Sequence, residues 1–287
     1  NYQIPGTMNN ANLRPEIVSS WEVGLDLRMF RNRLGVDLAY YNNTSKDLIV
    51  NMPVSSASGV TKRFANAGTI RNYGWELQIN GTLIKTRDEQ WKAYVNWSKN
   101  RNEVVDLGEG VDSWIVASYS SHAYMTAYKG GSLSAMYGLG YKRAPEGAYI
   151  VEKDGSITNV SGQIIVDENG YPQYSDELQY IGECTPDWKG GFGTSVKWKG
   201  LTVSVAFYGQ HGGNVYSYTN AVLGTRGKGS FTLAGRYDGL VLDGVNQLPD
   251  GNFIRNTHKT ADIVEYYGLA YAFQNCEQNF VSTEFLK

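Results

Sequence analysis

The sequence predicts an all-β fold: part of a transmembrane antiparallel β-barrel, with about six to eight strands of a larger barrel and long extracellular loops. Three observations support this class. Six segments alternate strictly between apolar and polar residues, and the links between them are short and long in turn. The 287 residues also include 33 Gly, 21 Tyr and 7 Trp against only 7 Pro. Glycine and aromatic residues suit pleated strands that are joined by tight turns.

The six predicted strand segments span residues 21–29, 34–41, 73–80, 91–98, 192–198 and 201–208. In the first, Trp21 and Val23 lie on one face and Glu22 and Gly24 on the other. A period of two is typical of strands, because successive side chains point to opposite faces. All charged residues of these segments fall on the polar faces: Glu22, Asp26, Arg28, Asp37, Glu76, Lys92 and Lys197. A row facing lipid would be free of charge in this way, but so would the interior of a soluble β-sandwich.

The links between these segments discriminate better between the two folds. Residues 31–33, 85–89 and 199–200 form short links, whereas 49–63, 105–186 and 211–282 form long ones. Outer-membrane barrels alternate short periplasmic turns with long extracellular loops in this way, and a sandwich has no reason to place every long loop at one end. Within the loop region 105–186 we expect a small hairpin from 148–151, a turn at 153–155 and a second arm at 163–166.

Composition excludes several other classes of protein. The formal net charge of −2 gives no basic field for nucleic acid, and the apolar runs are far shorter than the roughly 18 residues of a transmembrane helix. Cys184 and Cys276 form either one bridge or two unrelated thiols. His122, His211 and His258 have no partner at metal-ligand spacing. We therefore predict no metal, no cofactor, no catalytic residues and no enzymatic activity.

Several runs resemble the C-terminal barrel half of SusC/RagA-type TonB-dependent transporters. Asn12-Leu13-Arg14-Pro15-Glu16 followed by 20–26 resembles the start of a barrel strand, and Asn66-Ala67-Gly68-Thr69-Ile70-Arg71-Asn72-Tyr73-Gly74 resembles a second strand motif. Further matches lie at 130–138, 181–201 and 285–287, in order along nearly the whole chain. Asp167-Glu168-Asn169-Gly170 replaces a longer acidic stretch of the family and lacks a calcium ligand series.

The resemblance implies that residues 1–287 are the C-terminal portion of a receptor barrel, with the plug domain and the last strands absent. It implies a Gram-negative, Bacteroidetes-like outer membrane, a SusD-like lipoprotein as a lid, and TonB acting through the absent N-terminal part. The expected function is import of oligosaccharides or peptides. Two alternatives remain open: a soluble secreted carbohydrate-binding β-sandwich, and a β-rich glycoside hydrolase, for which no carboxylate pair stands out.

Aromatic residues in the long loops are the candidate ligand contacts, because their faces stack well on sugar rings and peptide side chains. The other interpretation is that they hold the loops together or contact a partner. The candidates are Trp114, Tyr119, Tyr124, Tyr128, Tyr216 and Tyr218.

Overall fold

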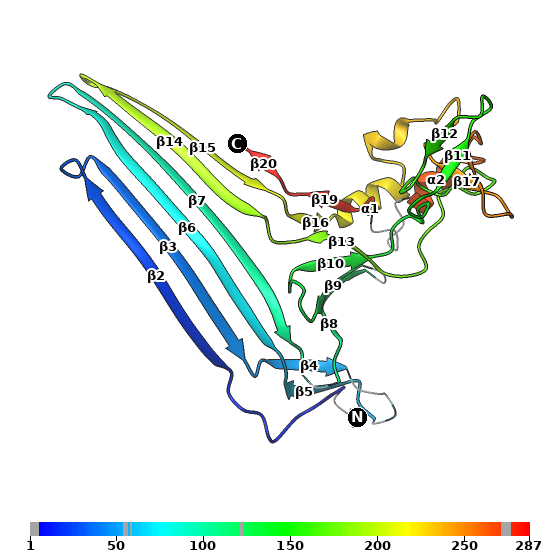
Figure 1. Ribbon diagram of the computed structural model, residues 1–287, viewed down its shortest axis with the longest axis horizontal. Coiled ribbons are helices and arrows are strands. Elements are labelled where there is room, and N and C mark those ends of the chain that lie inside the picture. The colour runs from blue at the N-terminus through cyan, green and yellow to red at the C-terminus, as the bar shows by residue number, and fades with distance from the viewer. Residues whose placement is uncertain (1–5, 54–56, 58, 109, 121–122, 271–276) are drawn as a thin grey trace.

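A computed structural model of the chain describes residues 6–53, 57, 59–108, 110–120, 123–270 and 277–287. Its main element is a curved seven-stranded antiparallel sheet, called the wall here (Figure 1). In spatial order the strands are β2 (Ile17–Met29), β3 (Leu34–Lys46), β6 (Thr69–Lys85), β7 (Glu89–Asp106), β14 (Trp188–Trp198), β15 (Leu201–His211) and β20 (Phe285–Leu286). The six predicted strands and the strand opening at 285–287 are confirmed, so the chain forms an open part of a barrel.

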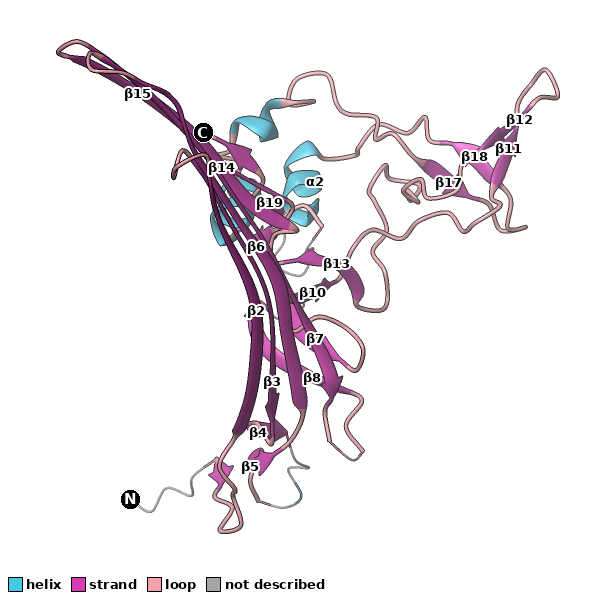
Figure 2. Cartoon of the chain, turned by 60° about the vertical axis from the view of Figure 1, so that its left-hand side comes forward, coloured by secondary structure: helices cyan, strands magenta, loops and turns pink. Residues whose placement is uncertain are grey.

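The register of the wall brings all the predicted apolar faces to one side, called the outer face. One continuous row across the first six strands consists of Leu27, Val36, Ile79, Val95, Phe192 and Phe207. Large apolar side chains on this face are exposed, Val23 at 65% and Leu201 at 61%. Figure 2, which shows the wall nearly edge-on, has β8, β10 and β13 on one side of it. Within the described residues no second sheet covers the outer face, as a sandwich would require, so the sandwich alternative is wrong.

The loops instead pack against the polar face of the wall, called the inner face. The Oδ1 atom of Asn102, on β7, accepts hydrogen bonds from the backbone N of Leu133 at 2.6 Å and from Ser132 Oγ at 2.9 Å. Val104, two residues further along the same face, is fully buried against Leu107 and Ala127. Because β7 has 18 residues and roughly 9–11 are enough to cross a bilayer, its last part extends beyond the membrane and can support loops.

Tyrosine rings cover two glycines on the inner face. Tyr41 lies over its cross-strand neighbour Gly74, and its hydroxyl donates a hydrogen bond of 2.9 Å to Asn100 Oδ1. Tyr94 lies in the same way over Gly193. The absent side chain at each glycine leaves room for the ring, which restores the packing that a glycine in a strand loses.

The three predicted short links are confirmed as direct hairpin connections at 30–33, 86–88 and 199–200. In the first, Phe30, Arg31 and Asn32 all have positive φ angles, from 52° to 62°, and in the third Lys199 has φ 51°. Such left-handed residues match the right-handed twist of the strands that a tight hairpin joins.

The three long connections hold the remaining elements apart from β1, which precedes β2 in the chain. Small strands pair as β1-β5-β4, β13-β10-β9-β8, β11-β12, β16-β19 and β17-β18. Their bounds are β1 (Thr7–Met8), β4 (Ile49–Pro53), β5 (Lys62–Asn66), β8 (Ser113–Ser120), β9 (Ala123–Tyr128), β10 (Ala135–Gly138), β11 (Tyr149–Val151), β12 (Ile157–Asn159), β13 (Gln179–Glu183), β16 (Asn214–Tyr216), β17 (Val245–Gln247), β18 (Phe253–Arg255) and β19 (Phe280–Ser282).

Helical segments also occur in the last long connection, which the all-β prediction did not include. They are α1 (Tyr218–Thr225), the 3₁₀ turn η2 (Ser230–Leu233) and α2 (Ile263–Ala270). Ser217 caps α1 by accepting a hydrogen bond from the backbone N of Asn220. Neither α-helix of the described part has the length or the apolar character needed to cross a membrane.

The hairpin predicted near residue 150 is partly wrong. Tyr149–Val151 and the turn are as expected, but β11 pairs with Ile157–Asn159 rather than with 163–166. The Asp154 carboxylate accepts hydrogen bonds from the backbone N of Ser156 at 3.0 Å and from its hydroxyl at 2.7 Å, so the turn closes at once and the next residues form the second arm. Residues 164–166 instead make isolated bridges to Arg143, Val245 and Pro172.

Candidate ligand-binding loops

A four-stranded sheet in the longest connection, β13-β10-β9-β8, brings three tyrosines side by side. Tyr137 on β10 is the register partner of Tyr180 on β13, and its ring lies 5.7 Å from the Tyr180 ring. On its other side the Tyr128 ring lies 4.9 Å away, edge to face. Tyr128, Tyr137 and Tyr180 are called the tyrosine row here. Tyr128 is 38% exposed and Tyr180 56%, so parts of these rings are open to a ligand.

The surroundings keep the tyrosine hydroxyls protonated. Burial raises the pKa of Tyr137, and the neighbouring Tyr128 and Glu183 raise it further. Partial burial also raises the pKa of Tyr180, with the Glu183 carboxylate adding to the effect. Both hydroxyls can therefore donate hydrogen bonds at neutral pH, and each ring face offers an apolar surface beside a donor.

Glu183 joins the tyrosine row to a polar pocket of about 350 Å³ between the loop sheet and the end of β7. Its carboxylate accepts hydrogen bonds from Ser134 Oγ at 2.7 Å and from the Tyr180 hydroxyl at 3.5 Å. Ser132 Oγ lies 2.9 Å from Ser134 Oγ. Arg101, which also lines the pocket, is paired with Asp187 at 2.6 Å. The pocket thus offers donors and acceptors of both kinds beside aromatic faces.

The six aromatic residues predicted as ligand contacts fall into different settings. Tyr119 stacks on Tyr216 at 6.1 Å, and Tyr216, only 9% exposed, also contacts Phe280 at 5.5 Å. These rings hold β8 and β16 together. Trp114 packs half-buried against the small core around Val104.

The other three candidates lie in other settings, and Tyr128, at 38%, is as exposed as Tyr119. Tyr128 belongs to the tyrosine row, and Tyr124 lies on the same face of β9 and opposite Tyr137 in register. Tyr218 begins α1 and is 60% exposed. Ligand contact by these residues stays a prediction, and the geometry favours Tyr128 and Tyr124.

The sequence interpretation missed Tyr137, Tyr180 and Glu183. Tyr180 and Glu183 stand in a five-residue strand, too short to show a clear period of two, and Tyr137 stands in a strand of four. Tyr137 did fall within the 130–138 run that resembles the family, so that resemblance was the available signal.

Within the described residues no group of three or more His, Cys, Asp or Glu side chains comes together as metal ligands would. Cys184 is an exposed free thiol. Cys276 and His122 lie outside the described residues. The arrangement of rings and hydrogen-bonding groups is suited to reversible binding of a polar ligand.

Comparisons with known proteins agree with this geometry. The family model "TonB dependent receptor-like, beta-barrel" matches residues 1–246. TonB-dependent receptor P3 of Formosa agariphila is 29% identical over 223 residues, which cover 75% of this chain and 22% of that protein. TonB-dependent receptor SusC of Bacteroides thetaiotaomicron is 30% identical over 105 residues, 36% of this chain and 10% of SusC.

Among solved structures, a chain of the RagAB peptide transporter has the same fold, with a TM-score of 0.62 and 20% identity over 95% of this chain and 28% of that one. The chain thus spans about a fifth of the length of P3 and just over a quarter of the solved RagAB chain. The matches, the bare apolar outer face and the alternating links all lead to one family. The chain belongs to the TonB-dependent receptor β-barrel family, similar to SusC and RagA, and is part of an outer-membrane barrel of the kind found in Bacteroidetes.

Proposed function

We propose that residues 1–287 are the C-terminal portion of the barrel of a nutrient importer for oligosaccharides or peptides. The plug domain, the first barrel half and the last strands would come from the remainder of the parent protein, and residues 105–186 would form an extracellular loop region. The observation that carries the proposal is the two-sided wall: its outer face is apolar and bare, while its loops gather on the inner side and bring the tyrosine row there.

The tyrosine row and the polar pocket would bind the nutrient at the barrel mouth. Tyr137 and Tyr180 offer aromatic faces, and Glu183 and the serines beside it offer hydrogen bonds to hydroxyl or amide groups. A SusD-like lipoprotein would cover the mouth, and TonB would act on the plug, so that the energy comes from outside this chain. This chain itself would do no covalent chemistry.

Sugar and peptide remain two candidates of the same kind. The RagAB relative is a peptide transporter by description. A ring face beside a carboxylate suits a sugar, whose CH groups stack on an aromatic ring while its hydroxyls donate to oxygen, and it suits a peptide amide equally.

The first experiment uses the full-length parent, tagged in its native cell. The protein is extracted from outer membranes with detergent, and co-purifying proteins are identified by mass spectrometry. We expect a SusD-like lipoprotein in near-equal amount. Recovery of the parent in the aqueous fraction would overturn the importer proposal, and membrane location without a lid would point to a receptor that works alone.

A second experiment tests the tyrosine row. A strain lacking the parent gene is complemented with wild type, with the double variant Tyr137→Ala/Tyr180→Ala, or with Tyr149→Ala, and is grown on an oligosaccharide mixture or a peptide mixture as sole carbon source. Two aromatic contacts are worth roughly 1–3 kcal/mol, or about 5- to 150-fold in affinity, so the double variant should need more nutrient. Tyr149 is a matched control, because it is 52% exposed but lies on the distant hairpin β11–β12. Equal growth of the double variant and wild type on both mixtures would remove the tyrosine row from the proposal.

A further inference from the structure

The outer face of the wall contains a pit near its loop end, where two neighbouring strands both lack a side chain. In one row across the wall, Trp97, Gly190, Gly209 and Leu286 stand side by side on β7, β14, β15 and β20. The two glycines in the middle form a floor of bare backbone. Trp97 rises on one side of this floor and Leu286 on the other.

Stacked aromatic pairs close the remaining two sides. In the row nearer the short turns, Phe192 and Phe207 stack with their ring centroids 4.8 Å apart. In the row nearer the loops, Trp188 and His211 stack at 5.9 Å. The resulting hollow, called the outer-face pit here, has a volume of about 580 Å³, within the roughly 300–1,000 Å³ typical of ligand sites.

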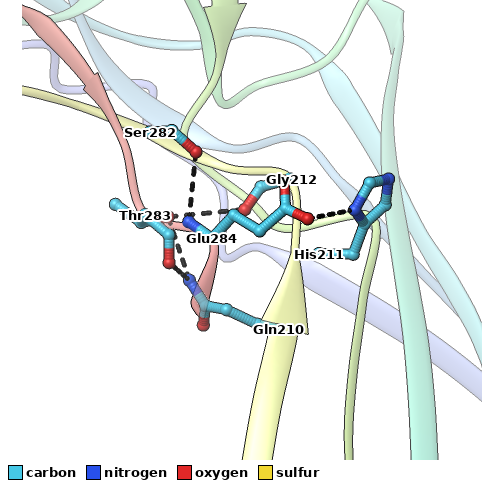
Figure 3. Close-up of polar contacts among 6 residues, drawn as sticks. All are labelled: Gln210, His211, Gly212, Ser282, Thr283 and Glu284. Atoms are coloured by element: carbon cyan, nitrogen blue, oxygen red, sulfur yellow. Dashed lines mark hydrogen bonds and ion pairs between the residues drawn. The ribbon is translucent and has the colours of Figure 1, made fainter. Parts of the chain in front are cut away.

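Polar contacts between the end of β15 and residues 283–284 hold β20, and with it the Leu286 side chain, in place (Figure 3). The amide Nε2 of Gln210 donates to the backbone oxygen of Thr283 at 2.8 Å and to its Oγ1 at 2.9 Å. At the loop-side rim, His211 Nδ1 lies 2.8 Å from Glu284 Oε1. The pit is thus apolar on its floor and walls and polar only at the rim nearest the loops.

We propose that the outer-face pit binds one acyl chain of an outer-leaflet lipid. The pit opens onto the exposed apolar outer face, and this face is the surface that the membrane covers. Lipid acyl chains therefore surround the opening of the pit. An acyl chain in the pit would cover the glycine backbone and the inward sides of the five aromatic rings that form its walls. On a flat part of the outer face, neighbouring side chains already make these contacts with one another. The polar rim of His211 and Glu284 suits the level where acyl chains meet headgroups. The assignment to the outer leaflet rests on the proposed function, which places the loops outside the cell.

The test is photo-crosslinking of the full-length parent in phosphatidylethanolamine vesicles that contain phosphatidylethanolamine with a diazirine on its acyl chain. Labelled peptides are mapped by mass spectrometry. We expect labelling to concentrate on Trp97, Trp188 and Phe207 rather than spread evenly to outer-face residues such as Val203 and Val205. Even labelling of all these residues would overturn the proposal.

Two variants on one strand separate a bound lipid from a general lipid contact. Trp188→Ala removes a wall of the pit, and Trp198→Ala removes an outer-face tryptophan ten residues along β14, on the same face but outside the pit. Native mass spectrometry of the delipidated parent, titrated with phosphatidylethanolamine, should show one retained lipid. Its affinity should fall about tenfold, or about 1.4 kcal/mol, in Trp188→Ala and stay unchanged in Trp198→Ala.

Gly190→Ala provides an independent variant, because its added Cβ would stand on the floor of the pit, 3.1 Å from the Asn96 backbone oxygen, 3.5 Å from the Trp188 ring and 3.6 Å from the Trp97 ring, and would make the pit shallower. Lipid retention by this variant at the wild-type level, or equal losses in both tryptophan variants, would refute the site. A neighbouring protein cross-linked at Trp188 in native membranes in place of lipid would also refute it. The gel mobility of the folded barrel checks that each variant folds. Failure of the importer proposal would appear in growth and lid recovery, and failure of the pit only in lipid binding.

Discussion

Replacing Gly74 by alanine should be among the most damaging single-methyl additions to the wall. An added Cβ would overlap the backbone carbonyl of Lys99 and stand 2.5 Å from the Tyr41 hydroxyl oxygen. The carbonyl belongs to a paired strand and cannot move away cheaply. The Tyr41 ring would have to leave its place over the glycine and would lose its hydrogen bond to Asn100. Overpacking costs about 1–3 kcal/mol and the lost hydrogen bond about 1 kcal/mol, so we expect a loss of roughly 2–4 kcal/mol in the free energy of unfolding.

Two other glycines of the wall allow the expected loss of stability at Gly74 to be compared with smaller changes. At Gly81, on the same strand, the nearest atom to an added Cβ is 3.9 Å away, so Gly81→Ala should be neutral or stabilise by roughly 0.5–1 kcal/mol. At Gly193 the three atoms nearest to an added Cβ all belong to the Tyr94 side chain, which is 43% exposed and can rotate aside. Gly193→Ala should therefore cost an intermediate amount, roughly 0.5–1.5 kcal/mol.

The assay is urea unfolding of the full-length parent, refolded into phosphatidylcholine vesicles, with the folded fraction read from gel mobility. The expected order of urea midpoints is Gly81→Ala highest, then Gly193→Ala, then Gly74→Ala. If Gly74→Ala and Gly81→Ala unfolded at the same urea concentration, the argument that the Tyr41 ring requires a bare glycine would be wrong.

Three further predictions concern turns and loops. Lys199→Val should lower the free energy of unfolding by roughly 1–2 kcal/mol, because a β-branched residue tolerates the φ angle of 51° poorly, while Lys199→Asn should be nearly neutral by the same urea assay. Gln210→Ala removes both hydrogen bonds to Thr283 and should speed hydrogen exchange at residues 285–287, with exchange at β2 unchanged as the internal reference. The hydrogen bond from Arg255 holds the pKa of the Glu152 carboxylate below its usual range. At a pH above the usual carboxylate pKa, this ion pair therefore stabilises the β11–β12 hairpin. The stabilisation is lost as the pH falls through the lowered pKa. Because Ser156 likewise lowers the pKa of Asp154 in the same turn, the comparison uses an Asp154→Asn background. Proteolysis at the 153–155 turn should rise on acidification in that background, and an equal acid response after the further change Glu152→Gln would contradict the reasoning.

The wall could be predicted almost completely from the sequence, and the candidate site only in part. A strand such as β2 alternates strictly over residues 21–29, because one face meets lipid and the other meets water, so apolar and polar residues take turns along it. In the loops a strand of three to five residues has no such contrast. The second arm of the hairpin, β12, has only three residues, and its one large apolar side chain, Ile157, is 71% exposed. With no apolar face to mark this arm, the prediction placed it at 163–166 instead.

The candidate site depends on register between segments that are far apart in the chain. Tyr137 and Tyr180 meet because β10 pairs with β13, 40 residues later, and no local pattern shows this pairing. The same holds for α1 and α2, which begin at a capping serine and at an acidic first turn but carry no long apolar stripe. Ligand contact by the loop aromatics stays a prediction, and the contacts of Tyr216 and Trp114 show that some of them hold the loops together.

The buried cores of the described residues lie in the loops or against them and are small and separate. One surrounds Val245 and Phe253, another Tyr266 and Tyr267, and a third Val104. The wall contributes only the end of β7 to these three cores, through Val104, and otherwise owes its order to its hydrogen-bond ladder. Loop modules can therefore be exchanged between relatives as units, each bringing its own interior. A library of chimaeras that keeps the seven strands and swaps residues 140–175 together with 240–270 would keep the core of Tyr171, Tyr266 and Tyr267 in one piece, and would vary the mouth of the barrel while the spanning part stays constant.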